Sequence, residues 1–405
     1  MNAPIRLVLT YHLTPKGDKA GAIYHNKDAG SKRHQRLIHM MHHMLFPYTF
    51  FEESLIDAVL IILSQKRGRK MEQQSTSLKL SQNSFDYFRL FAAFQVMFGH
   101  MVSLYEIKLP FYIPLRFIGG VPILFTLCGF LVTASYAKSK NVGEYFKKRF
   151  FRIFPPLWFS VWIGFVILLL FSNGAFPVGK AAVWTFLQGF ALQYTPGFAK
   201  EFGSGTFNGA LWALFTEMQF YLLVPLFYRF MKNRKIKSWL VIGIVLIAVQ
   251  IGGTELAAAS HSRGLILLWK RGILAQSSFF YIGSFLYVFK DTVLNRLIKY
   301  VPWLFAGYTF LYILWNIFDI GILQMLATDC LLPILILTLG YFLGQHRLRY
   351  DISYGIYLYH VMIINIFLEL QLSLNIGTTL LIVLLSCGCG VISLLIDKGF
   401  RKILP

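Results

Sequence analysis

Four ionisable residues fall inside segments that are otherwise apolar enough to cross a membrane: Arg89, His100, Glu217 and His360. An ionisable side chain in the bilayer core costs roughly 3 kcal/mol on insertion scales, and such residues commonly serve a function. An imidazole that a carboxylate orients can act as a general base and deprotonate a hydroxyl group. These residue types therefore predict base-catalysed chemistry inside a membrane. The alternative is that they form hydrogen bonds that only hold helices together.

The spacing of these residues predicts which of them act together. His100 follows Arg89 by eleven residues, about three helical turns, so the two side chains project from nearly the same face of one helix. At about 1.5 Å per residue, His100 lies near the far surface of the membrane, and Glu217 reaches a similar depth from that surface. We therefore expect Glu217 to orient His100. His360 is expected lower in the bilayer, lining a path for substrate or packing against other helices.

Two further features concern charged residues that are expected at the membrane surface opposite to the one near His100. Asp86 precedes Arg89 by three residues, so the two can pair on one helix face. Lys148, Arg149 and Arg152 form a basic cluster just before an apolar run. Arginine offers forked donors that match phosphate oxygens, so this cluster indicates a phosphate-bearing ligand. Its alternative is ordinary anchoring of a helix by positive residues.

The composition defines the class of protein that must position these residues. Of the 405 residues, 56% are hydrophobic and only 14% are charged, against about 25% in soluble domains, and the mean hydropathy is +0.57. The net charge of +21 does not indicate nucleic-acid binding, because the basic residues gather in short clusters between apolar runs. The chain is therefore expected to lie in a lipid bilayer.

The apolar runs predict an all-α polytopic membrane protein with about ten transmembrane helices. We place them near residues 85–105, 117–137, 153–172, 210–231, 238–254, 272–289, 301–318, 322–344, 354–370 and 376–396. Lys and Arg concentrate in alternate connections, which predicts that these connections and both termini are cytoplasmic. The connections 138–152 and 229–237 are both basic, so an even number of crossings separates them. The short segment 181–195 is therefore expected to be re-entrant or interfacial.

Residues 1–83 differ from the membrane domain, which we assign to residues 84–402. Six of the ten histidines lie before residue 71, and acidic residues interrupt the apolar run there. We interpret this extension as a disordered basic tail or as sequence upstream of a true start at Met71. No metal site is predicted. The four cysteines fall in apolar spans, which argues against a disulfide framework.

Five sequence blocks, at 85–100, 119–131, 145–155, 211–221 and 353–360, occur in an order that resembles the integral-membrane acyltransferase-3 family. Members of this family O-acylate bacterial surface polysaccharides, peptidoglycan and lipid-linked sugars. The resemblance extends from Ser84 to the C-terminus. It departs at Cys128, where the family often has Ser; Cys128 is then either a small packing residue or the carrier of a transient thioester.

The resemblance implies roles for particular residues. The catalytic group would be His100, Glu217 and Arg89. The acyl-CoA-binding group would be Arg149, Arg152 and Lys148. The group lining the substrate path would be Tyr354, Tyr357 and His360.

The expected function is O-acyl transfer, with acetyl as the default group, from cytoplasmic acyl-CoA (acetyl-CoA) to a hydroxyl of a cell-surface or lipid-linked carbohydrate. Acyl-CoA would be a co-substrate, and no permanently bound cofactor is implied. The expected location is the inner membrane of a bacterium. The alternative function is transport or flipping of a lipid-linked glycan, which would also require many spans and intramembrane charge.

Overall fold

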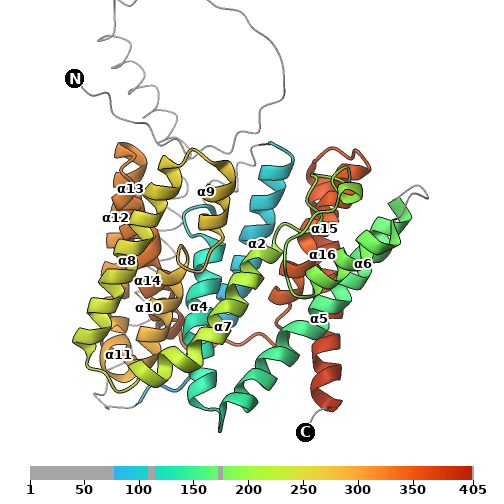
Figure 1. The fold of residues 1–405 in the computed structure, drawn as a ribbon. Helices are drawn as coiled ribbons and strands as arrows, with labels where there is room; N and C mark the ends of the chain where they lie inside the picture. The colour runs from blue at the N-terminus through green and yellow to red at the C-terminus, as the bar shows by residue number, and fades with distance from the viewer. Residues whose placement is uncertain (1–76, 108–114, 172–176, 404–405) are drawn as a thin grey trace, which may run out of the picture. The chain divides into compact units, whose positions relative to one another are not determined.

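The computed structural model of the chain describes residues 77–107, 115–171 and 177–403. Contacts divide the chain into two units, residues 1–76 and 77–405. The predictions for the histidine-rich extension and for a start at Met71 therefore lie outside the described residues. In the described part of the second unit every regular element is a helix, which confirms the all-α prediction (Figure 1).

Helices occur at all ten positions where the sequence predicts a span. They are α2 (Phe85–Leu104), α4 (Gly120–Ala137), α5 (Val142–Phe171), α7 (Leu211–Met231), α8 (Ile236–Ala259), α10 (Ser277–Val288), α12 (Val301–Phe318), α13 (Gly321–Met325) continuing through a π-helical turn (Leu326–Leu331) into α14 (Leu332–Phe342), α15 (Ser353–Glu369) and α16 (Ile376–Ile403). Short helices lie between them: α6 (Val178–Gly189), α9 (Arg263–Lys270), α11 (Asn295–Leu297) and a 3-10 turn (Gly197–Ala199).

Seven helical segments of the described residues are long and apolar enough to cross a membrane. The helices α2, α10 and α15 are not among them. α10 has 12 residues and α15 has 17, fewer than the roughly 20 that a straight crossing requires. The structure therefore supports a multi-pass membrane protein, and the count of ten crossings with both termini in the cytoplasm stays a prediction.

α5 begins earlier than the sequence pattern predicted. We expected the helix to start near residue 153, after a basic loop, but it starts at Val142 and carries both Arg149 and Arg152 on its surface. Asn141 and Glu144 explain this start: the Asn141 Oδ1 accepts from the Glu144 backbone N–H at 2.8 Å, and Glu144 Oε2 accepts from the Lys140 backbone N–H at 2.7 Å. Such reciprocal bonds resemble a capping box and satisfy the free N–H groups of a helix end.

The segment 181–195 forms no transmembrane helix. α6 has 12 residues, which gives a length of about 18 Å against a hydrocarbon core of about 30 Å. It packs along α5, where the Trp158 indole donates to the Gly189 carbonyl at 3.0 Å. The interpretation of this segment as non-spanning therefore agrees with the structure.

The basic connections lie at one end of the helices. In Figure 1 the turn between α4 and α5, the turn between α7 and α8, α11 and the C-terminal end of α16 all appear at the lower end. This arrangement agrees with the charge pattern, which assigned these connections to one side of the membrane.

Close packing fixes the helices that surround the site. α2 lies between α4 and α15, and α4 also contacts α7 and α10 (Figure 1). Glycines permit the closest of these approaches: a Cβ on Gly129 of α4 would lie 2.2 Å from the Phe280 carbonyl oxygen, and one on Gly283 of α10 would lie 2.4 Å from the Thr126 carbonyl oxygen. Small residues at such contacts let membrane helices pack backbone against backbone.

Candidate active site

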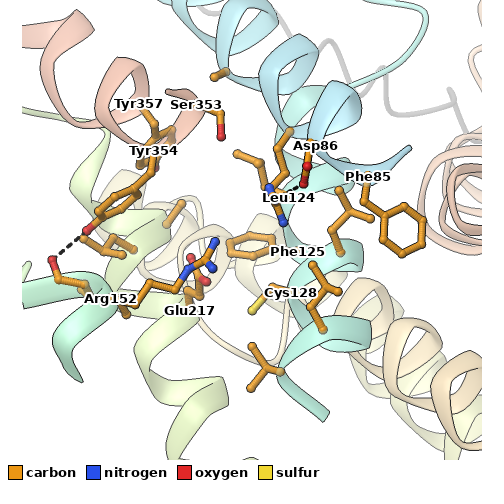
Figure 2. A pocket seen from close by; sticks show the side chains of 18 of the residues that line it. Phe85, Asp86, Leu124, Phe125, Cys128, Arg152, Glu217, Ser353, Tyr354 and Tyr357 are labelled. Carbon is orange, nitrogen blue, oxygen red and sulfur yellow. Dashed lines mark hydrogen bonds and ion pairs between the residues drawn. The ribbon is translucent and has the colours of Figure 1, made fainter. Parts of the chain in front are cut away.

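A cavity of about 390 Å³ lies among five helices, α2, α4, α5, α7 and α15, and is shown in Figure 2. Its wall joins two kinds of surface. The charged part contains Asp86, Arg89, Arg149, Arg152, Glu217 and Arg347. The apolar part contains Ala93, Val121, Leu124, Phe125, Ala213 and Leu214. With four arginines and two carboxylates, the lining carries a net positive charge, which favours an anionic ligand with an apolar portion.

Arg89 is held by two carboxylates, one expected and one not. It pairs with Asp86 on the same helix, as the sequence predicts, and its Nη2 also lies 2.9 Å from Asp351 Oδ2. Asp351 belongs to the connection between α14 and α15, and it receives hydrogen bonds from Ser353 as well. Arg89 therefore ties the start of α2 to the start of α15, and its charge is largely satisfied by the protein.

The ion pair with Arg89 perturbs the acidity of Asp351. Burial raises the pKa of the Asp351 carboxyl, but the Arg89 charge and the hydrogen bonds from Ser353 outweigh burial and hold the pKa below its ordinary value of 3.8. A pKa that is lower in the folded state means that the carboxylate stabilises the fold above the unfolded-state pKa. This stabilisation is lost as the pH falls through the folded-state pKa.

We expect Asp351→Asn to lower the free energy of unfolding by about 2 kcal/mol near pH 7, because it leaves the partly buried Arg89 with one carboxylate instead of two. The difference from the unchanged protein should narrow as the pH falls below about 4. Thermal unfolding in detergent across this pH range measures both effects. Asp319→Asn is the matched control, since Asp319 is exposed and has no ion pair within the described ranges. An equal loss in the control would contradict the assignment.

The two arginines of α5 differ from Arg89 in how much of their hydrogen-bonding capacity is used. The Arg149 Nη2 donates to the Ser135 hydroxyl at 2.9 Å, and its guanidinium lies 5.7 Å from the centre of the Tyr221 ring. The Arg149 Nε is buried and has no acceptor among the described residues. Arg152 makes no hydrogen bond or ion pair in that part of the chain, and its guanidinium points into the cavity beside Glu217 (Figure 2). Both arginines therefore have donors free for a ligand.

Lys148 is not part of the arginine cluster that lines the cavity. Its ammonium pairs with Glu144 at 2.6 Å, its side chain is 47% exposed, and it does not line the cavity. Successive residues of a helix point about 100° apart, and here Lys148 projects to the exposed side of α5 while Arg149 lines the cavity. The structure thus separates Lys148 from the two arginines with which the sequence grouped it.

Glu217 lies in the cavity wall, but it does not orient His100. Its Oε1 accepts a hydrogen bond from the Tyr221 hydroxyl, one helical turn further along α7. Cys128 is a free thiol that faces the same cavity near Glu217 (Figure 2). The expectation that Glu217 pairs with His100 was therefore wrong. Depth counted along each helix ignored the rotation of α7, which turns Glu217 toward α4 and α5.

The partner of His100 is His360. The His360 Nε2 lies 3.0 Å from His100 Nδ1, and the two ring centres are 5.0 Å apart. His360 is fully buried on α15, and its direct contact with His100 puts the two rings at a similar depth, so the expectation that His360 lies lower in the bilayer was also wrong. The two residues are 260 positions apart in the sequence, and only the packing of α2 against α15 brings them together.

The hydrogen bonds of this pair decide where the protons lie. The His360 Nδ1 is 3.0 Å from the Ile356 carbonyl oxygen, which can only accept, so Nδ1 carries a proton and the Nε2 of a neutral ring is an acceptor. The His100 Nδ1 faces that Nε2 and the Val96 carbonyl oxygen, at 3.1 Å, which are both acceptors. We therefore assign the second proton to His100 Nδ1, which leaves His100 Nε2 with a free lone pair.

The tyrosines of α15 connect the cavity with the histidine pair. Tyr354 and Tyr357 both line the cavity, as the sequence predicts for a substrate path, and Tyr354 donates to the Ile153 carbonyl at 3.1 Å. The Tyr357 hydroxyl donates to the Ala210 carbonyl, and its ring centre is 5.9 Å from that of His360. His100 and His360 do not line the cavity themselves. Tyr357 therefore stands between the two halves of the site.

Two asparagines that the sequence did not single out hold the segment before α7 against α15. Asn208 is buried and donates to the Leu358 carbonyl at 2.9 Å. Asn365 donates to the Thr206 and Phe207 carbonyls at 3.0 Å and accepts from the Ser204 N–H at 2.8 Å. Asparagine inside an apolar run is the sequence feature that could have identified Asn365. These bonds hold the segment 204–208 against α15, the helix that carries His360.

Comparison with known proteins defines the class of this multi-helix membrane protein as an acyltransferase. The chain belongs to the acyltransferase-3 family, whose sequence model, described as an acyltransferase domain, matches residues 82–397. It is 27% identical over 320 residues to nodulation protein 10 of Rhizobium leguminosarum bv. viciae, which covers 70% of this chain and 83% of the relative. It is 25% identical over 293 residues to the O-acetyl transferase of Shigella phage Sf6, which covers 68% of this chain and 83% of the relative. No solved structure matches the chain.

Proposed function

We propose that this acyltransferase moves an acyl group, acetyl in the first instance, from acyl-CoA to a hydroxyl of a cell-surface or lipid-linked carbohydrate. The observation that carries the proposal is a cavity with unsatisfied arginine donors whose wall, at Tyr357, lies beside His360, and His360 in turn contacts His100, the imidazole with a free Nε2. The relative named O-acetyl transferase supports both the acetyl group and the oxygen acceptor. The proposed location is the inner membrane of a bacterium.

The lining of the cavity matches the chemistry of the proposed acyl-CoA donor. Arg149 and Arg152 would bind the phosphates of CoA, since forked guanidinium donors match phosphate oxygens. The apolar wall would cover the pantetheine arm. That arm has a reach similar to four or five extended residues, roughly 15 Å. Arg89 and His100 are eleven residues apart on α2, about 16 Å along the helix. Arg89 lines the same cavity as Arg149 and Arg152. An arm that is anchored at this basic end and directed along α2 would therefore bring its thioester close to His100.

The proposed reaction uses His100 as a general base. The acceptor hydroxyl gives its proton to His100 Nε2 while its oxygen attacks the thioester carbonyl carbon. The C–O ester bond forms, the C–S bond breaks, and the CoA thiolate takes the proton from the imidazolium. His360 would keep the His100 ring in the required tautomer and orientation, as a hydrogen-bonded partner does in other histidine-based sites. The mechanism requires no metal and no permanently bound cofactor.

Arg152→Ala and Arg149→Ala should each raise the KM for acetyl-CoA roughly tenfold while leaving the KM for the acceptor unchanged. Each change removes a charged hydrogen bond worth about 1.5 kcal/mol or more. Steady-state rates, measured while acetyl-CoA or the acceptor is varied in turn, give the two KM values. Lys148→Ala is the matched control, because it removes a neighbouring positive charge that points away from the cavity. A similar rise in the control would show that only the general surface charge matters.

The function itself is tested with protein reconstituted in vesicles. Acetyl-CoA and a bacterial glycan extract are supplied, free CoA thiol is titrated, and the glycan is analysed by mass spectrometry. We expect CoA release that depends on the acceptor, together with a mass increase of one acetyl group. Acetylation of a nitrogen, or CoA release that is equal with and without glycan, would overturn the proposal.

A further inference from the structure

A second hollow lies at the turn between α7 and α8 and shares no lining residue with the cavity described above. Its volume is about 510 Å³. Arg234, Lys237 and Ser238 form its polar part, and Phe230, Val241 and Ile242 form its apolar part. We call this hollow the α7–α8 groove.

The floor of the groove is firmly packed. Trp239 is fully buried beneath it, and its indole N–H donates to the Met231 carbonyl at 3.0 Å. Its ring contacts those of Phe227 and Tyr281, at centre distances of 5.2 and 5.5 Å. These contacts anchor the start of α8 against α7 and α10, which supports the floor of the groove.

The cations of the groove have no ion-pair partner among the residues that the structure describes. Arg234 and Lys237 are exposed, and neither forms an ion pair in the described part of the chain. The lining contains no carboxylate. The groove also lies at the N-terminal end of α8, where the helix dipole adds to the favourable potential for an anion. The charge of the groove is thus complementary to a negatively charged group.

The position of the groove at the membrane surface indicates what the rest of the ligand must be chemically. α7 and α8 are both long and apolar enough to cross a membrane, so the turn that joins them lies at a membrane surface. The apolar side chains at its edge face outward: Phe230 is 63% exposed and Val241 is 59% exposed. Beyond them α8 presents further exposed apolar residues, including Leu240 and Ile244. A ligand here must have an anionic head at the surface and an apolar portion that enters the bilayer.

We infer that the α7–α8 groove binds an anionic phospholipid. The phosphate pairs with Arg234 and Lys237 and accepts a hydrogen bond from Ser238, while an acyl chain lies along Val241 and Ile242. Basic pockets between membrane helices recognise anionic head groups in this way. A second copy of the chain is a poorer occupant, because two such grooves face to face would bring four cations together.

Native mass spectrometry of the purified full chain, titrated with phosphatidylglycerol or phosphatidylcholine, tests this inference through binding and not through activity. We expect phosphatidylglycerol to bind preferentially. The double variant Arg234→Ala/Lys237→Ala should bind it roughly twenty-five-fold more weakly, because each surface charge contributes about fivefold. The matched control is Lys138→Ala/Lys140→Ala, which removes two exposed charges from the α4–α5 turn at the same end of the helices.

Three outcomes would overturn the inference. One is an equal loss of binding in the control, which would indicate general surface electrostatics. Another is equal binding of the two lipids by the unchanged protein. The last is a dimer that dissociates only in the groove variant, which would assign the groove to contact between two copies. None of these outcomes depends on whether the protein transfers acyl groups, so the proposed function is tested separately.

Discussion

His100→Ala should reduce acyl transfer by about a thousandfold or more, with the protein still inserted and folded. General bases contribute roughly 10² to 10⁴ to a rate, and alanine removes both the base and its contact with His360. Release of CoA thiol in the presence of a glycan acceptor measures the loss. The KM for acetyl-CoA should change little, because the imidazole lies outside the arginine-lined cavity.

The matched control is His261→Asn. His261 is an exposed histidine in the turn before α9 with a positive φ of 50°, a conformation that asparagine tolerates well. This variant should keep full activity. If folded His100→Ala kept more than about a tenth of the activity, His100 would not be the base.

His360→Ala should lower kcat by roughly a hundredfold with little change in either KM. The loss is smaller than for His100 because the Val96 carbonyl still accepts from His100 Nδ1 and partly preserves the tautomer. The ring would however lose its contact with α15, so Nε2 would no longer be held toward the acceptor. His360 acts through His100 and is a positioning residue.

His360→Gln separates positioning from simple packing. The amide oxygen of glutamine can occupy the place of His360 Nε2 and accept from His100 Nδ1, so this variant should recover about tenfold of the lost rate. Asparagine at the same position is too short to reach and should resemble alanine. Equal activity of the glutamine and asparagine variants would show that the hydrogen bond between the rings is not used. Thermal unfolding of each purified variant identifies a loss that is due to instability.

The sequence alone determined the features that repeat along one helix or follow from composition. Apolar runs gave the places of the helices, charge clusters gave the side on which connections gather, and a spacing of three residues gave the Arg89–Asp86 pair. It also marked His100, Glu217 and His360, because an ionisable residue in an apolar run is costly wherever the helix is placed. Each of these conclusions depends only on residues that are close to one another in the sequence, within a few helical turns.

Only the tertiary structure decided which of those residues meet. It joined His100 to His360, turned Glu217 toward Tyr221, added Asp351 to Arg89, and directed Lys148 away from Arg149. Helical periodicity fixes the angle between residues of one helix but not the rotation of that helix about its axis. The rotation of each helix and the identity of its neighbours depend on where small residues such as Gly129 and Gly283 let two helices approach closely. That is a property of the packed protein.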